Sequence, residues 1–234
     1  GTQVGHAAGV AYTFKLRQAP NVAVCILGDG GTSKGDFYEG MNMAGAWHVP
    51  LVIVINNNQW AISMPRAKQT AAATLAQKAI AAGIPGEQID GNDVIAVRQR
   101  VGAAIEHARH GGGPTLIEAV SYRLGDHTTA DDASRYRDEA SVKEAWRCEP
   151  IIRLRDYLAR LGAWDAAQEE ALIKECQQAV GAAVQAYLAL PHPDASAMFD
   201  CLYETLPDAM AEQLDTARQY DASGKTDTSG AHHG

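Results

Sequence analysis

Two short apolar runs, separated by a segment of helical periodicity, constrain the fold of this chain most strongly. The runs cover residues 21–27 and 50–55, are rich in β-branched side chains and hold almost no polar position. Such runs are typical of strands buried on both faces of a parallel sheet. Between them, apolar residues recur at helical spacing, at Phe37, Met41, Ala44 and Trp47. The pattern predicts a strand–helix–strand unit and therefore an α/β fold.

Small and oxygen-bearing residues follow each run. A Gly-Asp-Gly-Gly segment begins at Gly28, and a run of asparagines ends at Asn58. A right-handed crossover makes the two strands parallel, so their carboxyl ends share the edge at which α/β sheets bind ligands. The glycines let backbone N–H groups approach an anion, while Asp29 and Asn58 offer oxygen ligands to a cation. With a backbone carbonyl just beyond Asn58, these groups suit Mg²⁺ bridged to a diphosphate.

The α/β pattern continues through the first part of the chain. Residues 86–90 and 115–122 are expected to form further strands, and Asp93 is a candidate N-cap for a helix between them. Residues 124–138 are polar and lack an apolar period, which is typical of a functional loop at the carboxyl edge of a sheet. We therefore assign residues 1–140 to one α/β domain.

The remainder of the chain is expected to be helical and then disordered. Ser141 and Glu144 form a capping box, which predicts that a helix starts there. Residues 141–207 are accordingly predicted to be a helical C-terminal region, and residues 208–234 a tail. From about residue 221 onward Ser, Gly, Thr, Asp and His predominate, so the tail is expected to be largely disordered there.

Composition and charge exclude several classes of function. The formal net charge of -8, with no Lys/Arg cluster, argues against nucleic-acid binding. No apolar run approaches the roughly 20 residues of a membrane span. The four cysteines are widely separated and form no C-x-x-C pair, which indicates a reducing compartment, so a cytoplasmic protein is expected. The chain begins at Gly1, without Met, in what looks like the middle of a domain, and we expect it to lack an N-terminal part.

A series of sequence blocks carries a resemblance to a known enzyme family. The GDG at Gly28 and the NN ending at Asn58 look like the two-part motif of thiamine diphosphate enzymes. The wider match runs, in order, through GDGGTSKGDFYEG, NNNQWAIS, KQTAAATLAQKAIAAGIPG, DGNDVIAV, GPTLIEAVSYR and GDHTTADDASRYR. Together these blocks resemble the alpha subunit of the pyruvate dehydrogenase decarboxylating component in its bacterial heterotetrameric form. The resemblance extends to about Pro207.

The resemblance implies a fold, two cofactors and a set of site residues. The implied fold is the parallel-sheet thiamine diphosphate-binding fold with helices on both faces, followed by a helical C-terminal region. The implied cofactors are thiamine diphosphate and Mg²⁺, with Asp29, Asn58 and the backbone carbonyl of Trp60 as metal ligands. The residues implied to contact the cofactor are Gly28, Asp29, Gly30, Gly31, Ser33, Asn58, Trp60, Ala61, Ile62 and His127.

Several of these residues have a plainer alternative. Asp29 alone would suit a turn in which it bonds its own backbone. Ile62, implied to support the bent cofactor from beneath, would equally suit core packing. His127, implied to be catalytic beside the diphosphate and the active-site channel, would otherwise be a solvated loop histidine. Thr128 occupies the place where some eukaryotic relatives are phosphorylated on Ser, and we assign it no regulation.

The resemblance also implies a reaction and partners. The reaction is oxidative decarboxylation of pyruvate on thiamine diphosphate, with transfer of the acetyl group to a lipoyl domain of the dihydrolipoyl acyltransferase, a step that links glycolysis to the TCA cycle. In the family, the glutamate that activates the cofactor comes from the beta subunit, so a heterotetramer is implied and the chain alone is expected to be inactive. The alternatives are the alpha subunit of a branched-chain 2-oxoacid or acetoin dehydrogenase, or a non-catalytic truncated assembly subunit.

Overall fold

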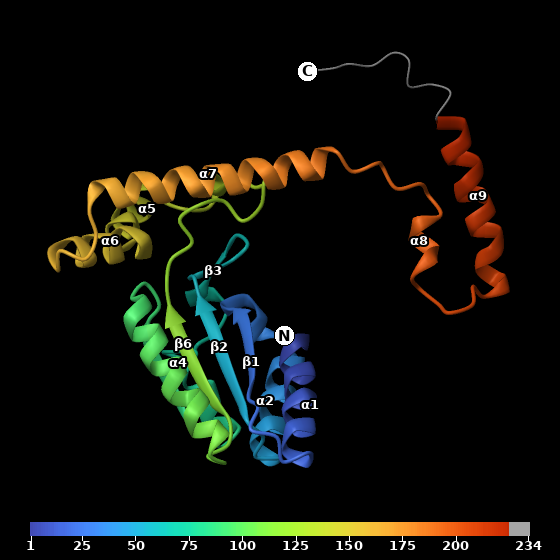
Figure 1. The fold of residues 1–234 in the computed structure, drawn as a ribbon. Coiled ribbons are helices and arrows are strands. Elements are labelled where there is room, and N and C mark those ends of the chain that lie inside the picture. The colour runs from blue at the N-terminus through green and yellow to red at the C-terminus, as the bar shows by residue number, and fades with distance from the viewer. Residues whose placement is uncertain (225–234) are drawn as a thin grey trace. The chain divides into compact units, whose positions relative to one another are not determined.

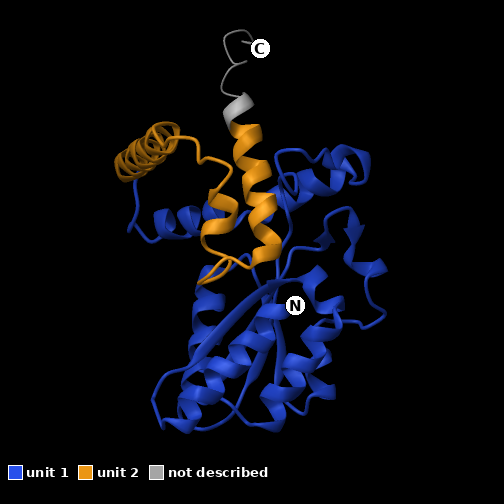
Figure 2. Ribbon diagram, turned by 90° about the vertical axis from the view of Figure 1, so that its right-hand side faces the viewer, with its two compact units in different colours: residues 1–165 blue, residues 166–234 orange. Residues whose placement is uncertain are grey.

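The computed structural model describes residues 1–224, and the chain divides into two compact units (Figure 2). The first unit ends at Asp165 and the second begins at Ala166. This division lies later in the chain than the predicted domain boundary between residues 140 and 141. The helices that follow residue 140 therefore cluster with the α/β part of the chain as far as Asp165.

The first unit is built on a four-stranded sheet in the order β1-β2-β6-β5, of which Figure 1 labels β1, β2 and β6. Every neighbouring pair is parallel. The register sets Gly28 of β1 opposite Asn56 of β2, so the two predicted turns leave the sheet at the same edge. The prediction of an α/β fold with a parallel strand–helix–strand unit is confirmed. The strands are β1 (Ala23–Gly28), β2 (Leu51–Asn57), β5 (Gly86–Asp90) and β6 (Thr115–Val120).

Helices cover both faces of the central strands. On one face, α1 (Thr2–Leu16) and α2 (Gly35–Ala46) enclose a core that includes Phe37, Met41, Ile53 and Ile55. On the other face, α4 (Val94–Arg109) packs on a second cluster that includes Val52, Val54, Ile117 and Ala119. Alternate residues of β2 therefore point into different clusters, and the predicted burial of this strand on both faces is confirmed.

The same prediction is wrong for β1. Its residues Ala23, Cys25 and Leu27 are buried, but Val24 is 45% exposed and Ile26 is 65% exposed. The physical reason is the position of α4, which packs on β2, β5 and β6. Since β1 is the edge strand beyond β2, the part of the chain that the structure describes covers only its face toward α1 and α2.

The sequence predicted where two helices begin, and the structure confirms one of these predictions and contradicts the other. Asp93 caps α4 as predicted, because its Oδ1 accepts hydrogen bonds from the backbone N–H groups of Ile95 (3.0 Å) and Ala96 (3.1 Å). The predicted start at Ser141 is wrong. Helix α5 (Glu139–Ala145) begins earlier, because Asp138 is the N-cap and its carboxylate accepts the N–H of Ser141 at 2.9 Å.

Short elements complete the first unit. They are the 3₁₀ turns η1 (Asp29–Ser33), η2 (Arg66–Lys68), η3 (Ala133–Arg135) and η4 (Trp146–Cys148), the hairpin strands β3 (Trp60–Ala61) and β4 (Met64–Pro65), and helices α3 (Lys78–Ala81) and α6 (Pro150–Arg160). Of these, η1 and the β3–β4 hairpin follow β1 and β2 directly. They form the edge at which a ligand site was predicted.

The second unit is helical. It contains α7 (Ala166–Leu188), α8 (Ala197–Asp200) and α9 (Asp208–Gly224). Helix α9 occupies part of the predicted tail, because residues 208–218 are rich in Ala, Met, Glu, Gln, Leu and Arg, which favour helix. It also extends past residue 221, where disorder was predicted, and residues 225–234 lie outside the described part of the chain. Across residues 1–224, no helix has the length and apolar character needed to cross a membrane.

Candidate functional site

Asp29 lies at the start of η1, and one of its two carboxylate oxygens is unsatisfied within residues 1–224. Its side chain is 1% exposed, and its Oδ2 accepts a hydrogen bond from Nε2 of Gln69 at 2.8 Å. Its Oδ1 is buried and has no hydrogen-bond partner within residues 1–224. A buried carboxylate oxygen without a partner is costly, and a bound cation would remove that cost. Because the bond to the Asp29 carboxylate comes from Gln69, the turn-aspartate alternative does not account for its position.

Buried hydrogen bonds brace the η1 turn from behind. The hydroxyl of Thr32 donates to the backbone carbonyl of Asp29 at 2.7 Å. The ammonium group of Lys78, on α3, donates to the carbonyl of Thr32 at 2.7 Å and to its hydroxyl at 3.1 Å. Lys78 and Thr32 are both buried. The conformation that presents Asp29 is therefore fixed by contacts beneath it.

The second turn folds the chain back immediately after β2. The side-chain oxygen of Asn58 accepts the N–H of Trp60 at 3.1 Å, and that of Asn57 accepts the N–H of Gln59 at 3.2 Å. Gln59 has a φ of 72°, which allows the reversal into the hairpin. An amide oxygen has two lone pairs, so Asn58 retains capacity for a further partner.

The two turns touch through Gly30 and Ala61. A Cβ atom placed on Gly30 would lie 2.7 Å from the Cβ of Ala61. Only glycine fits at this position without displacing the hairpin. The structure therefore brings together the turns that carry Asp29 and Asn58, as the sequence predicted from the ends of the two strands.

Ile62 has an unusual backbone conformation and an exposed side chain. Its φ is 54°, a value that is rare for a β-branched residue and that often marks a functional site. The side chain is 57% exposed, which excludes the core-packing alternative within this structure. The carbonyl of Ile62 accepts a hydrogen bond from Arg123 at 2.8 Å, which ties the hairpin to the segment after β6.

Tyr136 organises the polar loop after β6. Its hydroxyl donates to Oδ2 of Asp131 at 2.5 Å and accepts from Arg123 at 2.7 Å. Its ring lies 5.5 Å from the ring of Trp60, which places the loop against the hairpin. Burial, and then the bond to Asp131, raises the pKa of Tyr136. The same bond, followed by one from the N–H of His127, lowers the pKa of Asp131.

His127 and Ser33 lie at the margins of this arrangement. The backbone N–H of His127 donates to Asp131 at 2.8 Å, while the residue itself is exposed. Ser33 is exposed at the end of η1. Within residues 1–224, no side-chain hydrogen bond joins either residue to Asp29 or Asn58. The backbone positions of the loop are nevertheless fixed, because Arg137 donates to the carbonyls of Arg123, Leu124 and Gly125.

Two residues at the site were missed from sequence. Glu118 on β6 is fully buried and accepts from the side chain of Asn57 at 2.7 Å and from the N–H of Ala76 at 2.9 Å. Its signal was available, since it is the charged residue in the otherwise apolar run TLIEAV. Gln69 contacts Asp29, and nothing in its polar segment distinguished it.

The oxygen atoms available at this edge of the sheet resemble the ligands that proteins usually provide to Mg²⁺. Among the described residues, no group of three or more His, Cys, Asp or Glu side chains could hold a metal ion. Magnesium requires only one or two carboxylates when phosphate oxygens and water complete its octahedron. The free oxygen of Asp29 fits that requirement.

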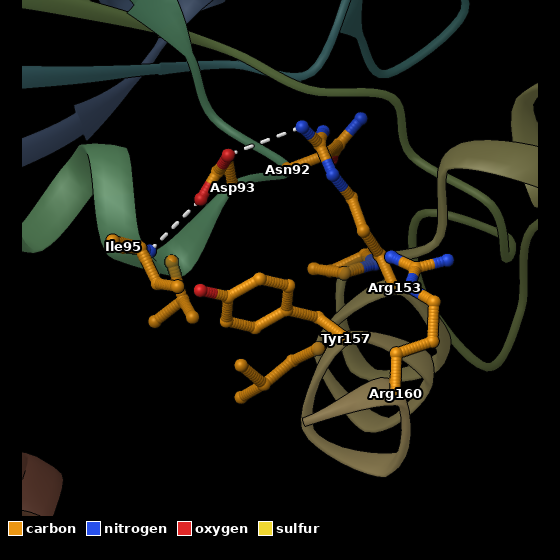
Figure 3. A pocket seen from close by; sticks show the side chains of 9 residues that line it. Asn92, Asp93, Ile95, Arg153, Tyr157 and Arg160 are labelled. Atoms are coloured by element: carbon orange, nitrogen blue, oxygen red, sulfur yellow. Dashed lines mark hydrogen bonds and ion pairs between the residues drawn. The ribbon is translucent and has the colours of Figure 1, made fainter.

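A separate cavity of about 370 Å³ lies between the start of α4 and α6 (Figure 3). Arg153 of α6 reaches across it and donates to Asp90 at 2.5 Å and to Asp93 at 3.1 Å. Tyr157 and Arg160 also line it. The two carboxylates already neutralise Arg153, so the contact serves to hold α6 on the end of β5 and the start of α4.

Comparison with known proteins places the chain in a family. The family model "Dehydrogenase E1 component" matches residues 1–196. A protein of Staphylococcus aureus strain Mu50 named "Pyruvate dehydrogenase E1 component subunit alpha" is 44% identical over 220 residues, which is 94% of this chain and 60% of that protein. A protein of the same name from Staphylococcus epidermidis strain ATCC 12228 is 43% identical over 220 residues.

The chain thus spans about 60% of the length of the curated relatives it matches. The family match covers β1, β2, β6 and the turns that follow them, where Asp29, Gly30 and Ala61 lie together. This chain belongs to the dehydrogenase E1 component family.

Proposed function

We propose that this chain forms the cofactor-holding part of a pyruvate dehydrogenase alpha subunit. The activity would be oxidative decarboxylation of pyruvate, with transfer of the acetyl group to a lipoyl domain. Family membership and the names of the relatives support this proposal. The observation that carries it is the buried Oδ1 of Asp29, which lacks a partner within the described residues at the edge shared with Asn58.

Thiamine diphosphate and Mg²⁺ would be held by the two turns. Asp29, the amide oxygen of Asn58 and the backbone carbonyl of Trp60 are the proposed metal ligands. When bound, thiamine diphosphate supplies the electron sink for decarboxylation of the 2-oxoacid. The residues of this chain would supply position and charge, because the carboxylate of Asp29 would hold the cation.

The remaining predicted residues would shape the rest of the cofactor site. Backbone N–H groups from Gly28 to Gly31 and the hydroxyl of Ser33 are proposed to face the diphosphate. Ala61 and Ile62 are proposed to lie beneath the cofactor, and the exposed side chain of Ile62 is available for that contact. His127 is proposed to orient the diphosphate end and the incoming lipoyl group from the loop after β6.

A partner chain would complete the active site. We propose a beta subunit that supplies the glutamate facing the cofactor, so that this chain alone does not turn over substrate. The assembled component would be a cytoplasmic heterotetramer that acts with a dihydrolipoyl acyltransferase. Membership of the dehydrogenase E1 component family supports this partner set.

Substrate turnover tests the proposal. The chain, purified together with a beta partner, is assayed with pyruvate, 3-methyl-2-oxobutanoate and acetoin in the presence of thiamine diphosphate and Mg²⁺. The expected result is a preference for pyruvate and no turnover by the chain alone. Preference for either of the other substrates contradicts the pyruvate assignment. Absence of any turnover by the assembled protein contradicts an enzymatic role.

A further inference from the structure

We propose that Gln69 is a positioning residue that presents the free carboxylate oxygen of Asp29 to a divalent cation. The inference rests on the proposed Mg²⁺ site and adds to it a residue outside the two ligand turns. Gln69 follows η2 and lies 40 residues from Asp29 in sequence. It touches the carboxylate on Oδ2, the oxygen opposite the one left free.

The orientation of the Gln69 amide is determined by its partners. Its Nε2 donates to Oδ2 of Asp29 at 2.8 Å and to the carbonyl of Met64 at 3.2 Å. Both partners are acceptors, so the reversed amide would set its oxygen against two other oxygens. One N–H of the amide therefore holds Oδ2 of Asp29 while the other anchors the amide to Met64, and the carboxyl group cannot rotate freely. Oδ1 is left in a fixed direction.

The chemistry of glutamine suits this task because its amide is neutral. It satisfies one oxygen of a buried carboxylate without cancelling the negative charge. A lysine or arginine at the same place would pair with Asp29 and compete with a cation. Residues that hold a metal ligand by hydrogen bonds commonly contribute to metal affinity in this way.

The segment that carries Gln69 is itself tied to the second turn. The N–H of Arg66 donates to the carbonyl of Gln59 at 2.8 Å, and the N–H of Gln69 donates to the carbonyl of Arg66 at 3.0 Å. The guanidinium of Arg66 bonds the carbonyls of Ala72 and Ala73, at 2.5 and 2.9 Å. Gln69 thereby couples the hairpin after β2 to the carboxylate after β1, and so links the two turns that would share one cation.

The test measures metal binding directly. Mn²⁺ serves as a paramagnetic probe for the divalent-cation site, and its binding in the presence of thiamine diphosphate is followed by electron paramagnetic resonance on the full chain with its beta partner. The variants are Gln69→Leu and Gln69→Lys. The matched control is Gln99→Leu, at an exposed position on α4. Thermal unfolding of each variant is recorded in parallel without metal.

The expected result separates a positioning role from a structural one. Gln69→Leu is expected to weaken Mn²⁺ binding roughly 10- to 100-fold, and Gln69→Lys to weaken it further because the new ammonium group occupies the carboxylate. Without metal, the unfolding temperature of Gln69→Lys is expected to be no lower than that of Gln69→Leu. The reason is that the new ammonium group forms an ion pair with the buried carboxylate of Asp29. The control is expected to bind as the wild type does.

Two different results would overturn the inference, and the behaviour of the wild type distinguishes them. If the wild type binds Mn²⁺ and both Gln69 variants bind within about twofold of it, Gln69 has no positioning role. If the wild type itself shows no saturable Mn²⁺ binding with thiamine diphosphate, the proposed function fails and the inference fails with it.

Discussion

The side-chain amide of Asn57 donates a 2.7 Å hydrogen bond to the carboxylate of Glu118, and both side chains are buried. The second carboxylate oxygen accepts the N–H of Ala76 at 2.9 Å. One glutamate thus joins β2, β6 and the segment before α3. Since Asn57 immediately precedes Asn58, this bond fixes the position from which the second ligand turn begins.

Replacement of this glutamate by its neutral isostere tests the connection. In Glu118→Gln, the new amide nitrogen must face either Asn57 or the N–H of Ala76, and both of these are donors. One buried donor then loses its partner, so we expect a loss of about 1–3 kcal/mol in the free energy of unfolding. Denaturant unfolding followed by circular dichroism gives the value.

Glu87→Gln is the matched control for that measurement. Glu87 pairs with Arg100 at the surface, where ion pairs contribute about 0–1 kcal/mol. The stability loss at Glu118 is therefore expected to exceed the loss at Glu87. Equal losses would show that the buried bond to Asn57 has no special role.

The contact between Gly30 and Ala61 makes a second prediction. Gly30→Ala would place a methyl group 2.7 Å from the Cβ of Ala61, so the two turns must separate. We expect a destabilisation of about 1–3 kcal/mol, as for other overpacked sites. Gly28→Ala is the control, because no atom of residues 1–224 lies within 4 Å of its added methyl group. A Gly28 variant as unstable as the Gly30 variant would contradict the steric explanation.

The hydrogen bonds of Tyr136 predict the accessibility of the loop after β6. Tyr136→Phe removes the donor to Asp131 and the acceptor for Arg123. Trypsin is expected to cleave after Arg135 and Arg137 several-fold faster in this variant than in the wild type. Tyr157→Phe, on α6, is the control. Unchanged cleavage in Tyr136→Phe would mean that the bonds from Arg137 alone hold the loop.

The pKa shifts of this pair predict the pH range over which the loop is ordered. The folded-state pKa of Tyr136 is raised, so its contribution is present below the ordinary value of about 10 and is lost as pH rises through the raised value. The pKa of Asp131 is lowered, so its contribution is present above about 3.9 and is lost as pH falls through the lowered value. Loop amides are thus expected to keep constant protection from hydrogen exchange, corrected for intrinsic rates, between roughly pH 5 and 9. Loss of protection near neutral pH would contradict this assignment.

Thiol reactivity provides a prediction that is independent of the site. Burial raises the pKa of the Cys25 thiol, while Cys148, Cys176 and Cys201 are exposed. Because the thiolate is the reactive form, a chromogenic thiol reagent is expected to modify the three exposed residues quickly and Cys25 only after denaturation. The variant Cys148→Ser should have one fewer rapidly reacting thiol than the wild type. A fourth rapidly reacting thiol in the native wild type would show that the reagent reaches Cys25, and would contradict its burial beneath α1 and α2.

Much of the ligand edge was predictable because sequence character changes abruptly there. The apolar runs give way to Gly28 and Asn56, which lie opposite each other in the register, and parallel strands must bring these ends to one edge. The exposed face of β1 was not predictable. Val24 and Ile26 are as apolar as the residues of β2, and apolar character does not reveal whether another element covers a strand.

The residues that hold the site in place depend on tertiary packing. Gln69 meets Asp29 across 40 residues of sequence, and Glu118 meets Asn57 across 61. No local period encodes such contacts, although a charged residue inside an apolar strand marks Glu118 as unusual. Residues 208–220 were assigned to a tail without a secondary structure, although their helix-forming residues favour the helix α9 that the structure shows there.

The measurement that tests the central claim most directly is calorimetric titration of thiamine diphosphate, with and without Mg²⁺, into the chain copurified with a beta partner. The wild type is compared with Asp29→Asn, which keeps the shape of the side chain and removes its charge. The account predicts saturable, Mg²⁺-dependent binding in the wild type and loss of that dependence in the variant. Equal affinity in the two proteins, or binding that is indifferent to Mg²⁺, would contradict a cation site at Asp29.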